Sequence, residues 1–338
     1  MSNNDEKQRT ANSGFALWGL TCFVEIFVQG STFLLRMNNS AKNPPQRKAA
    51  ERYVPYCDTL NDTKTERKTR PMNRLILLLI CLTTYNFGQA QTIDTLINVG
   101  NHKLHFNIIK GKGTPILFEA GNGDDGSVWQ SITNEIYKLT KATIITYDRA
   151  GLGKSEIDTT KISFHNEVKD LEIALKKLGY SKKIFIVCHS FGGYYASFFT
   201  HRNIKKVKGV VCIDIAIPCF FTKKWSDEFI QTIKEEDWKM IKQYKPGLFY
   251  ALNSFSNTAE FMQDKFLSSK TPVTMLMAEN IQPMLKEDEK ETWINCCKDF
   301  GTMPNHNFVI AENADHKVWV KNPTIVIDEI VKLYKKVK

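Results

Sequence analysis

Apolar and polar positions follow a regular order after residue 90. Residues 93–99 and 103–109 alternate between the two kinds, and Gly100-Asn101 between them is a two-residue hairpin signal. Six further segments are short apolar runs, which predict buried strands: 115–119, 142–147, 183–188, 207–214, 273–278 and 307–310. Segments with helical spacing separate most of them: 128–139, 164–178, a stretch reaching 199, 287–300 and 323–335. Strands that alternate with helices predict a mostly parallel sheet covered by helices on both faces.

Residues 72–90 have the three parts of a secretory signal peptide. Arg74 is followed by the uncharged run 75–82 and then by Gly88-Gln89-Ala90, with small residues before the expected cleavage point. The apolar run is too short to span a bilayer comfortably. We expect cleavage after Ala90 and a mature protein, residues 91–338, that is secreted or periplasmic.

Residues 1–71 show no pattern of strands and helices. The apolar stretch 15–37 is interrupted by Glu25, and residues 38–71 are polar and charged without periodicity. We expect Met72 to be the natural start and residues 1–71 to be an unstructured or spurious extension. The alternatives are a buried or interfacial helix at 15–37, or an anchor there that would give a membrane-attached form.

The net charge of +10 changes little in this picture. Residues 91–338 contain 34 Lys and Arg against 29 Asp and Glu, and the two signs are mixed along the chain, as in residues 234–242. This pattern is typical of a solvated surface rather than a nucleic-acid-binding stripe. We therefore expect no nucleic-acid partner, and no stable membrane insertion once the signal is removed.

Five cysteines follow the signal, and their odd number and spacing argue against a disulfide framework and a zinc site. Cys188 and Cys212 lie in apolar runs and are interpreted as small core residues. A single disulfide between Cys219 and either Cys296 or Cys297 is an alternative that the sequence does not decide. We expect neither a metal nor an organic cofactor.

The strongest chemical signal is Cys188-His189-Ser190-Phe191-Gly192, which lies between a buried strand and a helix. A nucleophile at such a sharp turn needs small neighbours two positions away on either side, because strand and helix approach each other there. Gly192 meets this demand, whereas Cys188 stands where glycine is usual. The start of the following helix supplies backbone N–H groups to a developing oxyanion.

From about Thr92 onward the chain resembles the α/β-hydrolase superfamily, in its esterase and peptidase-like branch with a short cap. The resemblance rests on the Ser190 turn, on residues 117–123 and 147–155, and on the loop that ends in His316. It implies an eight-stranded, mostly parallel sheet, with a helical cap at about 217–270. It also implies backbone oxyanion donors at Asn122 and Phe191, and a structural role for Asp148-Arg149.

The same resemblance implies the other two members of a catalytic triad. His316 follows the last strand and precedes the terminal helix, which is the family's place for the general base. The acid is expected after Ser190 and before His316 in chain order. Asp214 ends the sixth strand and Glu279 ends the seventh, and we favour Asp214 while keeping Glu279 open.

These residues predict a serine hydrolase that cleaves a small carboxylic ester through an acyl-enzyme. Phe220, Phe221 and Trp225 of the cap are candidates for binding the apolar part of the substrate. A peptidase or amidase of the same fold is the alternative, and a catalytically silent binding protein is a third possibility. Epoxide hydrolase and dehalogenase relatives are disfavoured, because their chemistry uses Asp at the position of Ser190.

Overall fold

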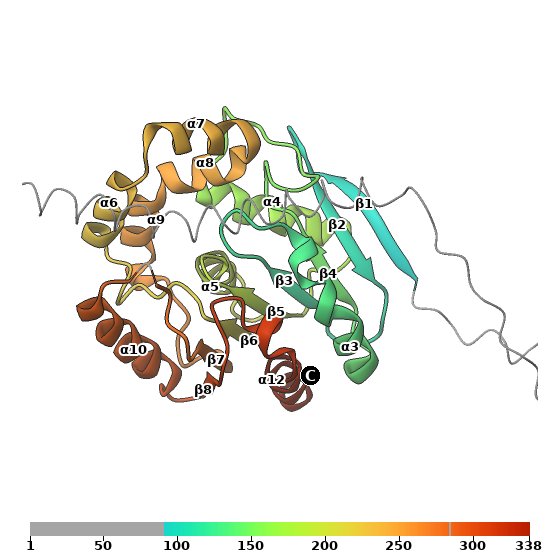
Figure 1. Ribbon diagram of the computed structural model, residues 1–338. Coiled ribbons are helices and arrows are strands. Elements are labelled where there is room, and N and C mark those ends of the chain that lie inside the picture. The colour runs from blue at the N-terminus through green and yellow to red at the C-terminus, as the bar shows by residue number, and fades with distance from the viewer. Residues whose placement is uncertain (1–90, 284) are drawn as a thin grey trace, which may run out of the picture. The chain divides into compact units, whose positions relative to one another are not determined.

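The computed structural model describes residues 91–283 and 285–338 (Figure 1). The expected signal peptide at 72–90 and the extension at 1–71 lie outside the described residues. The described part opens with the expected hairpin, in which β1 (Thr92–Asn98) pairs antiparallel with β2 (Lys103–Ile109).

Six more strands extend this hairpin into one sheet. They are β3 (Ile116–Glu119), β4 (Ile144–Tyr147), β5 (Ile184–His189), β6 (Val207–Ile213), β7 (Val273–Ala278) and β8 (His306–Ala311). The strand order is β1-β2-β4-β3-β5-β6-β7-β8, and β2 pairs antiparallel with both of its neighbours while the other pairings are parallel. The prediction of an eight-stranded, mostly parallel sheet is confirmed.

Helices cover both faces of the sheet, as the alternating pattern predicted. On one face, η1 (Gly126–Trp129) and α3 (Gln130–Thr140) share a buried cluster with α11 (Val318–Lys321) and α12 (Pro323–Val337). On the other face, α4 (Phe164–Lys177), α5 (Gly192–Arg202) and α10 (Glu287–Gly301) enclose a second cluster. The helical spacing of α4 explains its orientation, because Val168, Leu171 and Leu175 form one buried stripe.

The expected cap lies between β6 and β7. It consists of α6 (Lys223–Gln231), α7 (Glu235–Tyr244), α8 (Pro246–Asn253), α9 (Phe255–Phe261) and the short η2 (Met262–Asp264). A disulfide joins Cys219, just before α6, to Cys296 of α10, and this resolves the open pairing. Cys297 is a buried free thiol, because neighbouring residues on a helix point in different directions.

The parallel strands define two edges of the sheet. All of them end at one edge, here called the carboxyl edge, and begin at the other, here called the amino edge. Loops at the carboxyl ends of parallel strands are the usual place for a site in such sheets. In the part of the chain that the structure describes, no helix has both the length and the apolar character that crossing a membrane requires.

Candidate active site

Ser190 lies at the carboxyl edge, in the turn that joins β5 to α5. Its φ of 52° is in the left-handed region, which is unfavourable for a residue with a side chain. Backbone hydrogen bonds hold the turn, since Gly193 N and Ala216 N both donate to the Ser190 carbonyl, at 2.9 and 3.0 Å. The strained turn is therefore fastened to two neighbouring segments.

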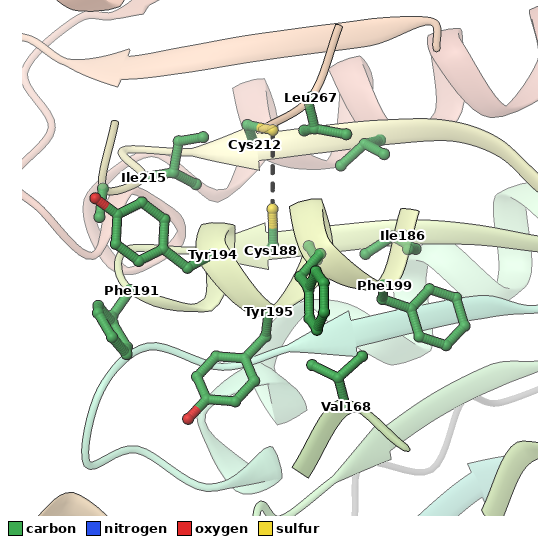
Figure 2. Packing of buried hydrophobic residues seen from close by; sticks show 14 of the residues in the cluster. Val168, Ile186, Cys188, Phe191, Tyr194, Tyr195, Phe199, Cys212, Ile215 and Leu267 are labelled. Atoms are coloured by element: carbon green, nitrogen blue, oxygen red, sulfur yellow. Dashed lines mark hydrogen bonds between the residues drawn. The ribbon is translucent and has the colours of Figure 1, made fainter. Parts of the chain in front are cut away.

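The neighbours of Ser190 pack as the sequence predicted. A Cβ added at Gly192 would lie 2.4 Å from the Ala120 carbonyl oxygen, so only glycine fits where α5 approaches the loop after β3. On the strand side, Cys188 is fully buried, with its Sγ 3.8 Å from that of Cys212 on β6 (Figure 2). A cysteine is small enough to fill this position in place of glycine.

His316 lies in the loop between β8 and α11 and connects Ser190 to Asp214. Its Nε2 is 2.9 Å from Ser190 Oγ, and its Nδ1 is 2.6 Å from Asp214 Oδ2. With a carboxylate on Nδ1, the neutral imidazole carries its proton on that nitrogen. The other nitrogen, Nε2, is then the acceptor that faces the serine hydroxyl.

The two candidate acids have different surroundings. Asp214 is 2% exposed, and its Oδ1 accepts the Ala278 N–H at 3.1 Å, which turns Oδ2 toward His316. Glu279 is exposed, and its Oε2 accepts the N–H of Asn313 at 2.7 Å. The carboxylate that contacts the imidazole is therefore that of Asp214.

Two side chains beside His316 were not singled out from the sequence. The Gln282 amide lies 3.0 Å from His316 Nδ1. His189 Nε2 donates to the His316 carbonyl oxygen at 3.0 Å, and the two rings are 4.4 Å apart. Burial, together with the nearby His316 and Lys317, lowers the pKa of His189 well below its usual value. His189 therefore stays neutral and holds the backbone of His316 in place.

The loop after β3, which contains the predicted oxyanion donor Asn122, lies against Ser190. A Cβ added at Gly121 would lie 3.2 Å from Ser190 Cβ, so the loop backbone is directly against Ser190. The Asn122 N–H comes from this loop, and the Phe191 N–H from the start of α5. Within residues 91–283 and 285–338, neither amide donates a hydrogen bond.

Arg149 holds the backbone of this loop in place through hydrogen bonds. Its Nη1 donates to Glu119 Oε1 at 2.5 Å and to the Ala120 carbonyl at 2.6 Å, while Nη2 donates to the Gly121 carbonyl at 2.6 Å. The guanidinium also lies 4.6 Å from the ring of Tyr195. The Gly121 carbonyl and the Asn122 N–H belong to one planar trans peptide and point in opposite directions. Arg149 thus fixes the orientation of the Asn122 N–H through the Gly121 carbonyl.

The three aromatic residues proposed to bind substrate form a cluster at the base of the cap. Phe220 and Phe221 contact Trp225 and also Trp293 of α10, with ring centroids 4.8–5.8 Å apart. Phe255, which the sequence analysis did not name, lies between this cluster and the nucleophile turn, 5.3 Å from Phe191. A role of Phe220, Phe221 and Trp225 in substrate binding stays a prediction.

A cavity of about 300 Å³ lies away from Ser190, between the hairpin strands and the η1–α3 segment. His105 is one of its lining residues, and its ring nitrogens lie 2.9 Å from Asp148 Oδ2 and 2.8 Å from Asp94 Oδ1. Asp148 also accepts the N–H groups of Gly126 and Lys154, which agrees with a structural role. Among the described residues, no group of three or more His, Cys, Asp or Glu side chains is arranged to hold a metal ion.

Comparison with known proteins agrees with this fold. The profile of the α/β hydrolase fold family matches residues 114–267. An uncharacterized protein of Bacillus subtilis strain 168, YqjL, is 33% identical over 217 residues, which cover 63% of this chain and 81% of that protein.

The fold is similar to that of the epoxide hydrolase VrEH1 from Vigna radiata, with a TM-score of 0.56 and 15% identity over 72% of this chain and 98% of the other. The haloalkane dehalogenase DatA from Agrobacterium tumefaciens C58 has a TM-score of 0.51 and 14% identity, covering 74% and 98% of the two chains. The chain belongs to the α/β-hydrolase superfamily.

Proposed function

We propose that this protein is a serine hydrolase that cleaves carboxylic esters through an acyl-enzyme intermediate. The observation that carries the proposal is the hydrogen-bonded series Ser190–His316–Asp214, built on a strained turn beside two backbone N–H groups. A nucleophile, a base that contacts it and a carboxylate that orients the base are the parts that acyl transfer needs. Ser190 occupies the nucleophile position, whereas epoxide opening and dehalogenation in this fold use a carboxylate there.

In the first half-reaction, Ser190 Oγ attacks the ester carbonyl carbon as His316 Nε2 takes the hydroxyl proton. The Asn122 and Phe191 N–H groups stabilise the negative charge on the carbonyl oxygen. His316 then gives its proton to the departing alcohol. Water attacks the acyl-enzyme with His316 again as base, which releases the acid and restores Ser190. Asp214 holds the imidazole in its reactive tautomer and stabilises its charged form.

Arg149 acts in this scheme as a positioning residue. Its bonds to the Ala120 and Gly121 carbonyls fix the peptide whose N–H faces the oxyanion. An oxyanion donor contributes most when it is held in place before the reaction begins. A rigid guanidinium that donates to both carbonyls meets that condition.

The proposal includes export of the protein to an oxidising compartment. Two observations support it: the signal-like sequence at 72–90 and the Cys219–Cys296 disulfide, a bond that is rare in cytosolic proteins. Expressed from Met72 in a Gram-negative host, the protein should be recovered from the periplasm with Gln91 as its first residue. An intact mass that retains residues 72–90 in exported, active protein would contradict this part.

The central test combines labelling with turnover. An organophosphonate should modify the protein once, at Ser190, and Ser190→Ala should lose both labelling and hydrolysis of p-nitrophenyl esters. A panel of these esters, run against aminoacyl-naphthylamides, separates an esterase from a peptidase of the same fold. Labelling at another serine, or turnover by Ser190→Ala, would show that Ser190 is not the nucleophile. Labelling without turnover of any substrate in the panel would favour a silent binding protein.

A further inference from the structure

The folded surface separates charges that are mixed along the sequence. The amino edge comprises the segments where the parallel strands begin and the neighbouring helix ends: residues 110–115, 138–143, 176–183, 202–208, 268–272, 298–305 and 332–338. These segments contain 18 of the 34 basic residues that follow residue 90, but only one of the 29 acidic residues, Asp299. The even spacing of charge along the chain therefore does not carry over to the surface.

Hydrogen bonds join these segments into one continuous edge. Lys112 N donates to the Lys141 carbonyl at 2.7 Å, and Ile184 N donates to the Lys206 carbonyl at 3.1 Å. The Tyr334 hydroxyl of α12 donates to the Thr114 carbonyl at 2.8 Å. Similar backbone bonds connect the starts of β6, β7 and β8: Val210 N to Pro272 O and Val273 N to Asn305 O. The basic residues thus belong to one region and not to scattered loops.

Most of these cations are exposed and have no carboxylate partner. Seventeen of the 18 residues are exposed, and Lys208 is half-buried. Three of the 18 pair with a neighbouring carboxylate: Lys138 with Glu135, Arg202 with Glu172 and Lys332 with Glu329. The other fifteen make no ion pair within residues 91–283 and 285–338.

Helix dipoles explain only part of this accumulation. Lysines in the last turn of α3, α4 and α12 offset the negative ends of those helices. However, Lys110, Lys112, Lys182, Lys183 and Lys270 lie in loops that lead into strands and offset no helix. Unpaired like charges repel one another and destabilise the folded state. The presence of these loop lysines at one edge therefore needs another explanation.

We propose that the amino edge is a peripheral docking surface for an anionic lipid bilayer, which it binds through the headgroup phosphates. All but one of the 18 cations are lysines, which attract phosphate as point charges and do not form the two-pronged bonds of arginine. The aromatic residues of the edge, Tyr180, Phe300 and Tyr334, are buried or half-buried, so none is exposed for stacking on nucleic-acid bases. These features favour a lipid surface over a nucleic acid.

The proposal has a geometric consequence. Ser190, Asp214 and His316 follow the carboxyl ends of their strands, at the edge opposite the lysines. A molecule docked by its amino edge keeps that site on the side away from the bilayer, open to soluble substrate. The docking surface does not depend on the proposed chemistry, and Ser190→Ala should bind vesicles as the parent chain does.

The test compares two variants with the same change in net charge. Lys182, Lys183, Lys205 and Lys206 are changed together to Gln in the edge variant. In the control variant, Lys223, Lys224, Lys239 and Lys242 of the cap are changed to Gln. The probe is sedimentation with vesicles of phosphatidylcholine containing phosphatidylglycerol, or of phosphatidylcholine alone. Using the full chain throughout makes any contribution of residues 1–90 common to all samples.

The parent chain and the cap control should bind the anionic vesicles at low salt, release them at about 0.5 M salt, and ignore neutral vesicles. The edge variant should partition at least about tenfold less. Equal losses in both variants would overturn the proposal, because net charge alone would then explain binding. Binding of a 30-base-pair duplex without binding of anionic vesicles would overturn it in favour of a nucleic acid.

Discussion

The charged side chains that support the candidate active site at the carboxyl edge are buried and paired, whereas those of the amino edge are exposed and mostly without an ion pair. Glu119 and Arg149 are almost inaccessible and contact each other, and Asp214 is held by a backbone N–H and by His316. Each of these charges has a defined partner at a defined distance. At the amino edge nearly all of the lysines are exposed, and most of them make no ion pair among the described residues.

The difference indicates two ways of using charge. A buried charge without its partner is costly, so a buried network can hold atoms in a single arrangement. An exposed charge is screened by water and salt, so it acts through the sum of many neighbours. Single substitutions should therefore have large effects at the carboxyl edge and small ones at the amino edge.

The largest effect is expected at Asp214. Asp214→Asn keeps the shape of the side chain but removes the charge and favours the wrong imidazole tautomer, so kcat should fall by about 10⁴. Glu279→Gln is the matched control, and it should retain activity within about tenfold because Glu279 contacts Asn313 instead of the imidazole. Steady-state ester hydrolysis measures both. The reverse ranking would place the acid after β7.

A smaller effect is expected at Arg149. Lysine cannot donate to Glu119 and to both loop carbonyls together, so Arg149→Lys should misorient the Asn122 N–H and lower kcat by about 10², with little change in KM. Glu119→Gln is the control, because it removes the buried counter-charge but leaves the two carbonyl bonds.

The control should lose about 3 kcal/mol of unfolding free energy and yet keep kcat within about fivefold. Denaturant unfolding and steady-state kinetics are measured on the same samples. If the two variants lost activity in proportion to their loss of stability, Arg149 would be structural only. Loss of phosphonate labelling by Ser190→Ala tests the proposed function separately from this role.

A pH effect is expected at Glu167, in the first turn of α4. Burial raises its pKa to about 7, against the opposing influence of Arg149 and of the hydrogen bond from Tyr195. The folded state then binds this proton more tightly than the unfolded state, so stability falls as pH rises from about 4.5 to about 7. Relative to Glu167→Gln, the parent chain should lose about 1–2 kcal/mol of unfolding free energy between pH 5 and 8. Parallel stability curves for the two proteins would contradict this assignment.

The smallest effect is expected from single lysines at the amino edge. Lys182→Gln or Lys205→Gln should change the unfolding free energy by no more than about 0.5 kcal/mol and leave ester hydrolysis unchanged. Urea titration and steady-state kinetics are sufficient to detect a larger change. A loss above about 2 kcal/mol would mean that these side chains have structural partners, and the contrast between the two edges would fail.

The local pattern of the chain was enough to predict the eight strands, the helices on both faces and the turn at Ser190. The two hairpin strands alternate, the other six strands are short apolar runs, and helices repeat about every 3.6 residues, so each of these signals is contained in neighbouring residues. The tight turn likewise needs small residues at fixed offsets, of which Gly192 is the clearest. The short helix α11 was missed, because four residues are too few to show a period.

Contacts between distant residues were decided only by the tertiary structure. The sequence left Asp214 and Glu279 open because both end strands, and only the β6–β7 register and the path of the loop after β8 bring Asp214 to His316. The choice of Cys296 over Cys297 depended on which side of α10 faces the cap. Arg149 gained its role from carbonyls almost thirty positions away. The basic amino edge arose because parallel strands gather loops that the sequence separates by scores of residues, and no local pattern records that assembly.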